Sequence, residues 1–226
     1  MDAKYFKFSI VEPVSPPSFL TTDTYTWSWL IAEAGNLSLS GATVTGATDM
    51  GPNSHDWTGS GGVGPQWDSG NGEIDFTYGD AAGLSVSYTP AAQPFTIYLV
   101  IRINTYNAGG TTMLFSESTF GRLVQDGSIS QVNFSMGSWM SISNASGTTY
   151  GIITVIANTT ASSLQWNNET PTVDNAGTDG LEFMSLGYDT ENMGMSIKEV
   201  ITRSRVDDAS SIASVKSYLN AKYSLY

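Results

Sequence analysis

The sequence predicts an all-β sandwich that ends in one short α-helix, and two observations favour this fold class. Glycine, serine, threonine and asparagine dominate the 226 residues, charged residues make up only 13%, and 23 glycines separate short apolar runs. This pattern is typical of many strands joined by turns. In addition, an alternating segment at residues 193–205 leads directly into an amphipathic segment at residues 206–223. A chain of this length suits one large β domain.

The first strands are expected near the N-terminus. Residues 5–10 alternate aromatic and polar side chains, and a proline-rich stretch at residues 12–17 then ends the strand, because proline cannot continue a sheet ladder. Two more strands are predicted at residues 25–34 and 36–41. We therefore divide the chain into an N-terminal arm with the first strands (1–40), a glycine-rich loop region (41–89) and a sandwich core with the helix (90–226), which together form one continuous domain.

The C-terminal helix follows from residue spacing. Asp207 or Asp208 is expected to cap its N-terminus, where a carboxylate accepts backbone N–H bonds and favours the positive end of the helix dipole. Apolar residues recur three and four positions apart and predict a buried face. That face consists of Ile212, Val215, Leu219 and Tyr223, and the opposite, solvated face is predicted to carry Ser211, Ser214, Lys216 and Asn220. A helix this short is unstable alone, so we expect it to dock on the sandwich.

A family resemblance supports the same architecture. Four apolar segments and a closing motif, in this order, resemble a concanavalin A-like jelly roll of the laminin-G superfamily. The segments lie at residues 94–103, 112–116, 150–157 and 180–187, and the motif is Tyr-Leu-x-x-Lys-Tyr from Tyr218 to Tyr223. The resemblance covers about residues 90–226. It implies a jelly-roll β-sandwich of a kind that occurs widely in bacteriophage structural proteins and secreted bacterial proteins.

Composition and charge exclude several function classes. The chain carries a net charge of −12 with only nine lysines and arginines, which are scattered, whereas nucleic-acid binding needs clustered basic residues. We therefore expect no nucleic-acid partner. No apolar run approaches the roughly 18–20 residues that span a bilayer, and the polar N-terminus lacks the apolar stretch of a secretory signal. The absence of cysteine excludes disulfides and thiolate metal sites.

Aromatic residues beside glycine- and asparagine-rich turns are the main candidates for ligand binding. Trp57, Trp67 and Trp166 are candidates for stacking on a sugar face, while Asn168 could hydrogen-bond sugar hydroxyls. Tryptophan is also the largest core filler. For Trp166 we favour the packed alternative over the exposed one, because the resemblance implies that a strand turns over at residues 162–168.

Two groups of carboxylates suggest further chemistry. The run from Asp174 to Gly180 offers several oxygen ligands in one turn, so Asp174 and Asp179 are weak candidates for calcium, although such clusters are also ordinary turn chemistry. Glu73-Ile-Asp75 resembles part of the Glu-x-Asp-x-Glu strand of the family 16 glycoside hydrolases, in which alternate carboxylates act as nucleophile and acid. The third acid is absent here, so we expect no enzyme activity and no required cofactor, with hydrolysis as the alternative.

The leading functional prediction is a non-enzymatic structural or adhesion protein of a phage virion, such as a head decoration or fibre component. Its expected partners are other virion proteins or further copies of itself, with cell-surface glycans as possible ligands. The alternative is a carbohydrate-binding module or lectin, and the corresponding alternative location is extracellular.

Overall fold

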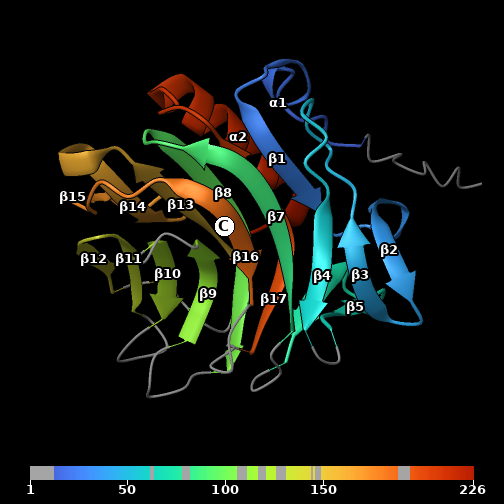
Figure 1. The fold of residues 1–226 in the computed structure, drawn as a ribbon. Helices are drawn as coiled ribbons and strands as arrows, with labels where there is room; N and C mark the ends of the chain where they lie inside the picture. Colours follow the sequence, from blue (N-terminus) through green and yellow to red (C-terminus); the bar gives the residue numbers. More distant parts are fainter. Residues whose placement is uncertain are drawn as a thin grey trace, which may run out of the picture.

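The structure is a computed structural model that describes residues 13–61, 64–77, 82–105, 111–116, 121–125, 131–143, 145, 149–187 and 194–226. The described chain forms two layers of antiparallel strands with a helix on the outside of one layer (Figure 1). The predicted fold class, a β-sandwich with a C-terminal helix, is confirmed. The strand expected at residues 5–10 lies outside the described residues.

The front layer of Figure 1 runs from one edge of the sandwich to the other. In spatial order its strands are β12 (Trp139–Ile142), β11 (Val132–Met136), β10 (Gly121–Gln125), β9 (Thr111–Ser116), β16 (Leu181–Leu186), β7 (Ala82–Ala91), β4 (Trp57–Gly61), β3 (Thr43–Ala47) and β2 (Leu37–Ser40).

The rear layer carries the helix. Its strands in spatial order are β15 (Thr172–Asp174), β14 (Ser162–Trp166), β13 (Gly151–Ala157), β8 (Phe95–Thr105) and β17 (Gly194–Arg203). The free edge of β17 pairs at one end with β1 (Thr26–Ile31) and at the other with β6 (Glu73–Phe76), which in turn pairs with β5 (Gln66–Asp68). Because β3 pairs with both β4 and β5, it joins the two layers.

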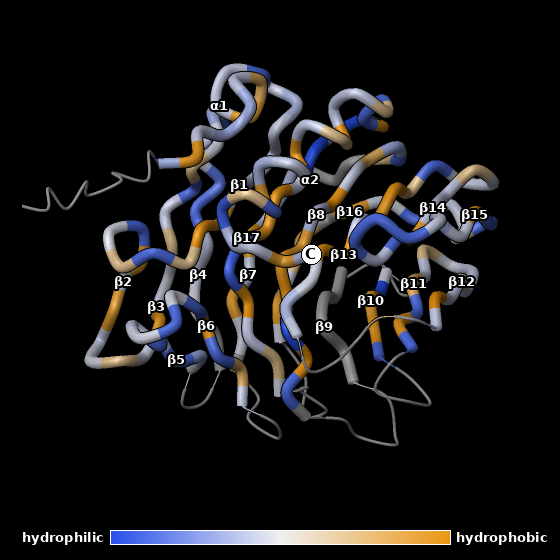
Figure 2. The backbone as a smooth tube through the Cα atoms, turned by 180° about the vertical axis from the view of Figure 1, so that it is seen from behind, coloured by the Kyte–Doolittle hydropathy of each residue, from blue (hydrophilic) through white to orange (hydrophobic). Residues whose placement is uncertain are grey.

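Two apolar clusters hold these layers together. One lies between the sheets and includes Leu99, Phe134 and Met184, whose side chains are fully buried. The other lies between the rear layer and the helix α2 (Ala209–Tyr223), and it joins residues such as Tyr98 and Leu219. Figure 2, seen from behind, shows hydrophobic residues on β8 and β17 where they run near α2. The remaining helical elements are short: α1 (Phe19–Thr22) and the 3₁₀ turns Ala34–Asn36 and Thr159–Ala161.

The helix confirms most of its predicted pattern. Asp208 is the cap, and its Oδ1 accepts a hydrogen bond of 2.7 Å from Ser211 N. Val215 and Leu219 are buried as expected. The prediction that Lys216 lies on the solvated face is wrong, because Lys216 stands four positions after Ile212 and three before Leu219 and so shares the docked face of the helix. The turn after β14 covers it and leaves the lysine only 6% exposed. Among the helices that the structure describes, none has the length and apolar character needed to cross a membrane.

The segment predicted as a glycine-rich loop contains strands instead. Within residues 41–72 the structure places β3, β4 and β5. Glycine here permits close approach of backbones: a Cβ atom at Gly46 would lie 2.8 Å from the carbonyl oxygen of Trp57, and one at Gly59 would lie 3.0 Å from the backbone of Thr45. These glycines therefore serve strand packing. Strands from all three predicted segments pair with one another, as β2 does with β3, β6 with β17 and β1 with β17.

Candidate functional site

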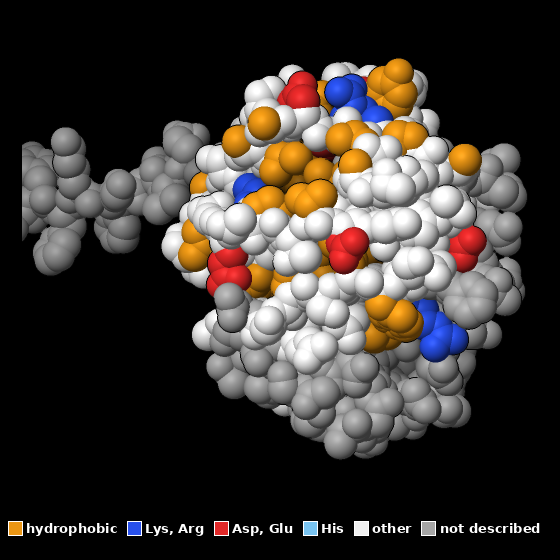
Figure 3. All heavy atoms as spheres, turned by 90° about the vertical axis from the view of Figure 1, so that its left-hand side faces the viewer, with side chains coloured by type: hydrophobic (Ala, Val, Ile, Leu, Met, Phe, Trp, Pro, Cys, Tyr) orange, Lys and Arg blue, Asp and Glu red, His pale blue; other side chains and the backbone are white. Residues whose placement is uncertain are grey.

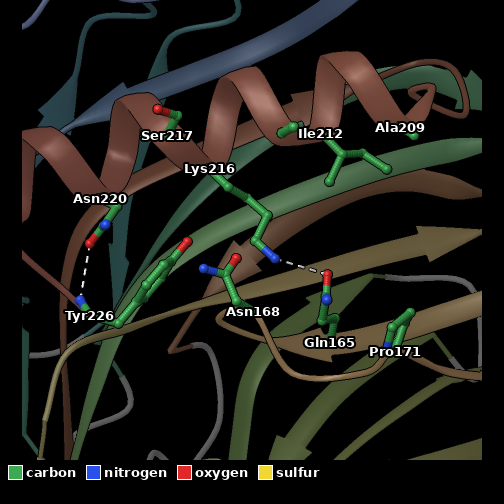
Figure 4. Close-up of a pocket in the computed structure, with 10 residues that line it drawn as sticks. Gln165, Asn168, Pro171, Ala209, Ile212, Lys216, Ser217, Asn220 and Tyr226 are labelled. Carbon is green, nitrogen blue, oxygen red and sulfur yellow. Dashed lines mark hydrogen bonds between the residues drawn. The ribbon is translucent and has the colours of Figure 1, made fainter.

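A groove between α2 and the turn after β14 is one of three cavities of similar volume that we find in the described chain. Its volume is about 520 Å³, which lies in the usual range for small-ligand sites. Amide, hydroxyl, ammonium and apolar groups all line it. The lining residues are Gln165, Asn168, Pro171, Ala209, Ile212, Ala213, Lys216, Ser217, Asn220 and Tyr226 (Figure 4).

The turn after β14 is held rigidly in place. Asn167 has a left-handed backbone (φ 48°), which asparagine tolerates better than most residues. Its side-chain Oδ1 accepts from Ile152 N at 2.8 Å, and its own N–H donates to Ile152 O at 2.8 Å. Trp166, immediately before it, is buried against Gly151. These contacts fix Asn168 at the rim of the groove, where its side chain is exposed.

Lys216 projects from α2 toward this turn, as Figure 4 shows. Its Nζ donates to Gln165 Oε1 at 3.0 Å and to the carbonyl oxygen of Asn167. Burial lowers the pKa of Lys216, because the charged form loses hydration. None of the ion pairs between described residues involves Lys216.

The end of the helix supplies an aromatic ring to the same groove. Ser224 takes a left-handed conformation (φ 52°) and turns the chain back. Asn220 Oδ1 then accepts hydrogen bonds from the backbone N–H groups of Leu225 and Tyr226, both at 3.0 Å. Burial raises the pKa of Tyr226, and a side-chain hydrogen bond with Asn168 partly opposes the shift. The Tyr226 residue remains 47% exposed, so its ring is accessible to a ligand.

The tryptophans predicted to stack on a sugar do not offer open ring faces. Trp57 and Trp166 are only 2% and 4% exposed and belong to the core between the sheets. The stacking prediction for Trp57 is therefore wrong, whereas the packed alternative for Trp166 agrees with the structure. Trp67 on β5 is half-buried and packs against the same core. Trp139 on β12 is 56% exposed.

Figure 3 views the side of the molecule that lies at the left of Figure 1, and its described surface is mostly uncharged, with few charged side chains.

The loop predicted to bind calcium directs most of its backbone groups toward the protein. The carbonyl oxygen of Ala176 accepts from Met136 N at 2.6 Å, and the carbonyl oxygens of Gly177 and Asp179 accept from Gln93 Nε2. The Asp174 side chain accepts from the neighbouring Asn175 N. In the part of the chain that the structure describes, Asp174 and Asp179 do not belong to a cluster of three histidine, aspartate or glutamate side chains that could share a metal ion. The loop therefore docks onto the turn between β11 and β12.

A cluster of charges that the sequence only partly predicted lies on the outer face of β5, β6 and β17. Carboxylate oxygens of Asp68, Glu73 and Asp75 all lie within 4.8 Å of one another. Glu73 is only 1% exposed and pairs with Arg102 Nη2 at 2.8 Å. The alternation along β6 had predicted that Glu73 and Asp75 share a face, but Arg102, which pairs with Glu73, comes from β8 and had no sequence signal.

Further partners neutralise this cluster. Tyr150 donates its hydroxyl to Glu73 Oε2, and Lys198 Nζ lies 3.8 Å from the same oxygen. Burial raises the pKa of Asp75, although a hydrogen bond from Ser196 opposes the shift. A hydrogen bond from the Asn71 side chain lowers the pKa of Asp68. The environments of two neighbouring carboxyl groups thus shift their pKa values in opposite directions.

Comparison with known proteins identifies the fold but not a family. No protein-family model and no curated protein matches the sequence. One similar solved structure is the binding domain of botulinum neurotoxin DC in complex with SialylT, with a TM-score of 0.65 and 14% identity over 87% of this chain and 52% of that one. A second is Trypanosoma rangeli sialidase, with a TM-score of 0.61 and 12% identity over 86% of this chain and 32% of that one. A third is the binding domain of Paraclostridial Mosquitocidal Protein 1, with a TM-score of 0.58 and 12% identity over 80% of this chain and 50% of that one.

These identities show a shared fold alone. The chain spans about half the length of the toxin binding domains and about a third of the sialidase. The concanavalin A-like β-sandwich expected from the sequence is confirmed by this likeness.

Proposed function

We propose that this protein is a carbohydrate-binding module that holds a sugar in the groove between α2 and the turn after β14. The observation that carries the proposal is the groove itself. A cavity of about 520 Å³ combines three side-chain amides, an ammonium group and an accessible tyrosine ring. Amides match the alternating donors and acceptors of sugar hydroxyls, and an aromatic ring can pack against the apolar face of a pyranose.

Proteins of the same fold support this choice of ligand class. The botulinum neurotoxin DC binding domain was solved in complex with SialylT, and a structure of the type C toxin describes entry that depends on two ganglioside molecules. The Trypanosoma rangeli sialidase was solved in complex with sialic acid. Each of those chains is much longer than the matched region, so the position of the site in this protein rests on its own groove.

The test is a glycan array followed by calorimetric titration of any sugar that binds. Replacing Asn168 by Ala removes one hydrogen-bonding side chain at the rim, and we expect affinity to fall about fivefold to tenfold, the effect of one lost hydrogen bond. The control is Asn71→Ala, an exposed asparagine on the hairpin between β5 and β6 that does not line the groove. A protein that binds no glycan, or an Asn168→Ala variant that binds as tightly as the original, contradicts the proposal.

Hydrolysis is a second candidate, favoured by one observation. Asp75 has a raised pKa and the neighbouring Asp68 a lowered one, which is the separation that an acid and a base require. Because Glu73 is buried and bonded to Arg102, replacing it would disturb the fold, so Asp75→Asn is a sharper test of hydrolysis than Glu73→Gln. Release of 4-nitrophenol from 4-nitrophenyl glycosides that Asp75→Asn abolishes would establish hydrolysis, and no release by the unmodified protein would reject it.

Assembly in a virion stays a prediction, and one structural feature supports an assembly role. A second cavity of about 550 Å³ lies between the proline-rich arm, β1 and α2, and apolar residues such as Val14, Trp29, Met50 and Tyr218 line it. Light scattering, which measures the mass of the protein in solution, tests the assembly role. A stable trimer or larger assembly favours this role, and a monomer argues against it. The virion and the extracellular space are both compatible with a glycan ligand.

A further inference from the structure

Resting on the proposed glycan site, we propose that the groove selects sugars that carry a carboxylate, and that the ammonium group of Lys216 recognises that carboxylate. The amides around the lysine would bind hydroxyl groups of the same sugar. The ligand class is therefore an acidic monosaccharide unit, such as a sialic or a uronic acid, rather than a neutral hexose.

The environment of Lys216 is unusual for a lysine. The residue is 6% exposed, and its ammonium group reaches the groove beside the turn after β14 (Figure 4). Two of its three hydrogens are donated to Gln165 Oε1 and to the Asn167 carbonyl. The third hydrogen of the Lys216 ammonium forms no hydrogen bond with another described residue. That hydrogen is available to a ligand in the groove.

The charge of Lys216 has no counter-ion among the described residues. Lys198, Arg203 and Lys222 each lie within 4.0 Å of a carboxylate oxygen, whereas Lys216 forms no such pair. The lining of the groove contains no aspartate or glutamate, although acidic residues outnumber basic ones by 21 to nine in the chain. Burying an unpaired charge is unfavourable. Such an arrangement is typical of functional sites, where a ligand supplies the missing charge.

The remaining groups are placed to hold the rest of the sugar. Asn168 and Tyr226 lie on one side of the lysine, and Gln165 lies on the other (Figure 4). Asn220 fixes Tyr226 through two backbone hydrogen bonds, so the ring is positioned before a ligand arrives. A carboxylate bound to the ammonium group would therefore bring the sugar ring beside the hydrogen-bonded side chains of Asn168 and Tyr226.

The experiment compares ligands that differ in one charge. Calorimetric titrations would use the methyl glycosides of N-acetylneuraminic acid and of glucuronic acid, together with the carboxyl methyl ester of each. A hydrogen bond to a charged group is worth more than a neutral one, so we expect at least one acid to bind about tenfold to a hundredfold more tightly than its own ester. This comparison uses the unmodified protein and does not depend on the folding of a variant.

Two variants then locate the effect. Lys216→Met keeps the aliphatic volume but removes the charge, and we expect it to bind acid and ester equally. Arg122→Met removes a charge from an exposed position on β10, outside the groove, and should keep the preference for the acid.

Equal binding of acid and ester by the unmodified protein overturns this inference but leaves the glycan site standing. Binding of neither also overturns this inference, and the glycan site is then decided by the array and by Asn168→Ala. A preference for the acid that survives in Lys216→Met shows that another cation is responsible and also overturns the inference.

Discussion

Replacing Gly151 by Ala tests whether the Trp166 ring is locked in the core. Gly151 lies on β13 beneath that ring, and a Cβ atom there would lie 2.2 Å from Trp166 Cζ2 and 2.4 Å from Cη2. Carbon atoms in contact normally stand about 3.5 Å apart. The ring would therefore have to move by about 1.3 Å (3.5 minus 2.2), and it has little room because Trp166 is only 4% exposed.

The expected magnitude follows from this overlap. Overpacking a core typically costs about 1–3 kcal/mol, and a rigid ring buried between the sheets favours the upper end, about 3 kcal/mol. With a urea dependence of about 3 kcal/mol per molar, the midpoint of unfolding would fall by about 1 M. Because Trp166 precedes the turn that carries Asn168, we also expect weaker glycan binding in this variant.

Urea unfolding followed by tryptophan fluorescence and by circular dichroism provides the assay. The matched control is Gly35→Ala, where an added Cβ atom meets nothing within 4 Å, and its midpoint should hardly change. In a Trp166→Phe background the smaller ring leaves space, so Gly151→Ala should cost less there. If Gly151→Ala unfolds at the same urea concentration as the original protein, the Trp166 ring is free to move and our account of the turn is refuted.

Three further predictions concern the rest of the structure. Glu199→Ala removes a buried carboxylate that accepts hydrogen bonds from the Trp29 indole N–H at 2.7 Å and from the Tyr223 hydroxyl at 2.7 Å, so we expect a loss of about 3 kcal/mol in a denaturant titration; a loss below about 0.5 kcal/mol would show that these bonds contribute little. Hydrogen bonds from Ser211 lower the pKa of Asp208 to about 2 from 3.8, so folding favours its charged form; this stabilisation is complete above pH 3.8 and is lost as the pH falls toward 2. Asp208→Asn keeps a cap without the charge and should lose less stability over that range, whereas parallel losses would contradict the assignment. Calcium should not stabilise the loop at residues 174–180, because carbonyl groups of this loop already accept protein hydrogen bonds; an upward shift of the melting temperature that is lost in Asp179→Asn would restore the calcium prediction.

Local patterns predicted the fold well. The apolar run at residues 94–103 forms β8, and the run at residues 150–157 forms β13. Both strands are buried on their two faces, so continuous β-branched and aromatic sequence was a strong signal. The helix was also predictable, because its capping residue and its apolar spacing are local features.

The site was less predictable because it depends on contacts between distant parts of the chain. Lys216 lies four positions after Ile212 and three before Leu219, so helical spacing places it beside the buried face. Its hydrogen-bond partners come from the end of β14 and the turn after it, a distant part of the chain, and had no local signal. The exposure of tryptophans depends in the same way on which strand covers each ring. Asn168 was predicted because asparagine in a turn is a local signal, whereas Tyr226 reaches the groove only through the left-handed turn at Ser224.

The most direct test of the proposed site is to map a bound sugar on the isotopically labelled protein by NMR. A glycan identified on the array would be titrated while the backbone and side-chain amide signals are followed. We predict that the largest shifts fall on the side-chain amides of Gln165, Asn168 and Asn220, which line the groove. Shifts that gather instead around Asp68 and Asp75, or around Trp139, would show that the protein binds its sugar elsewhere and would contradict the proposed site.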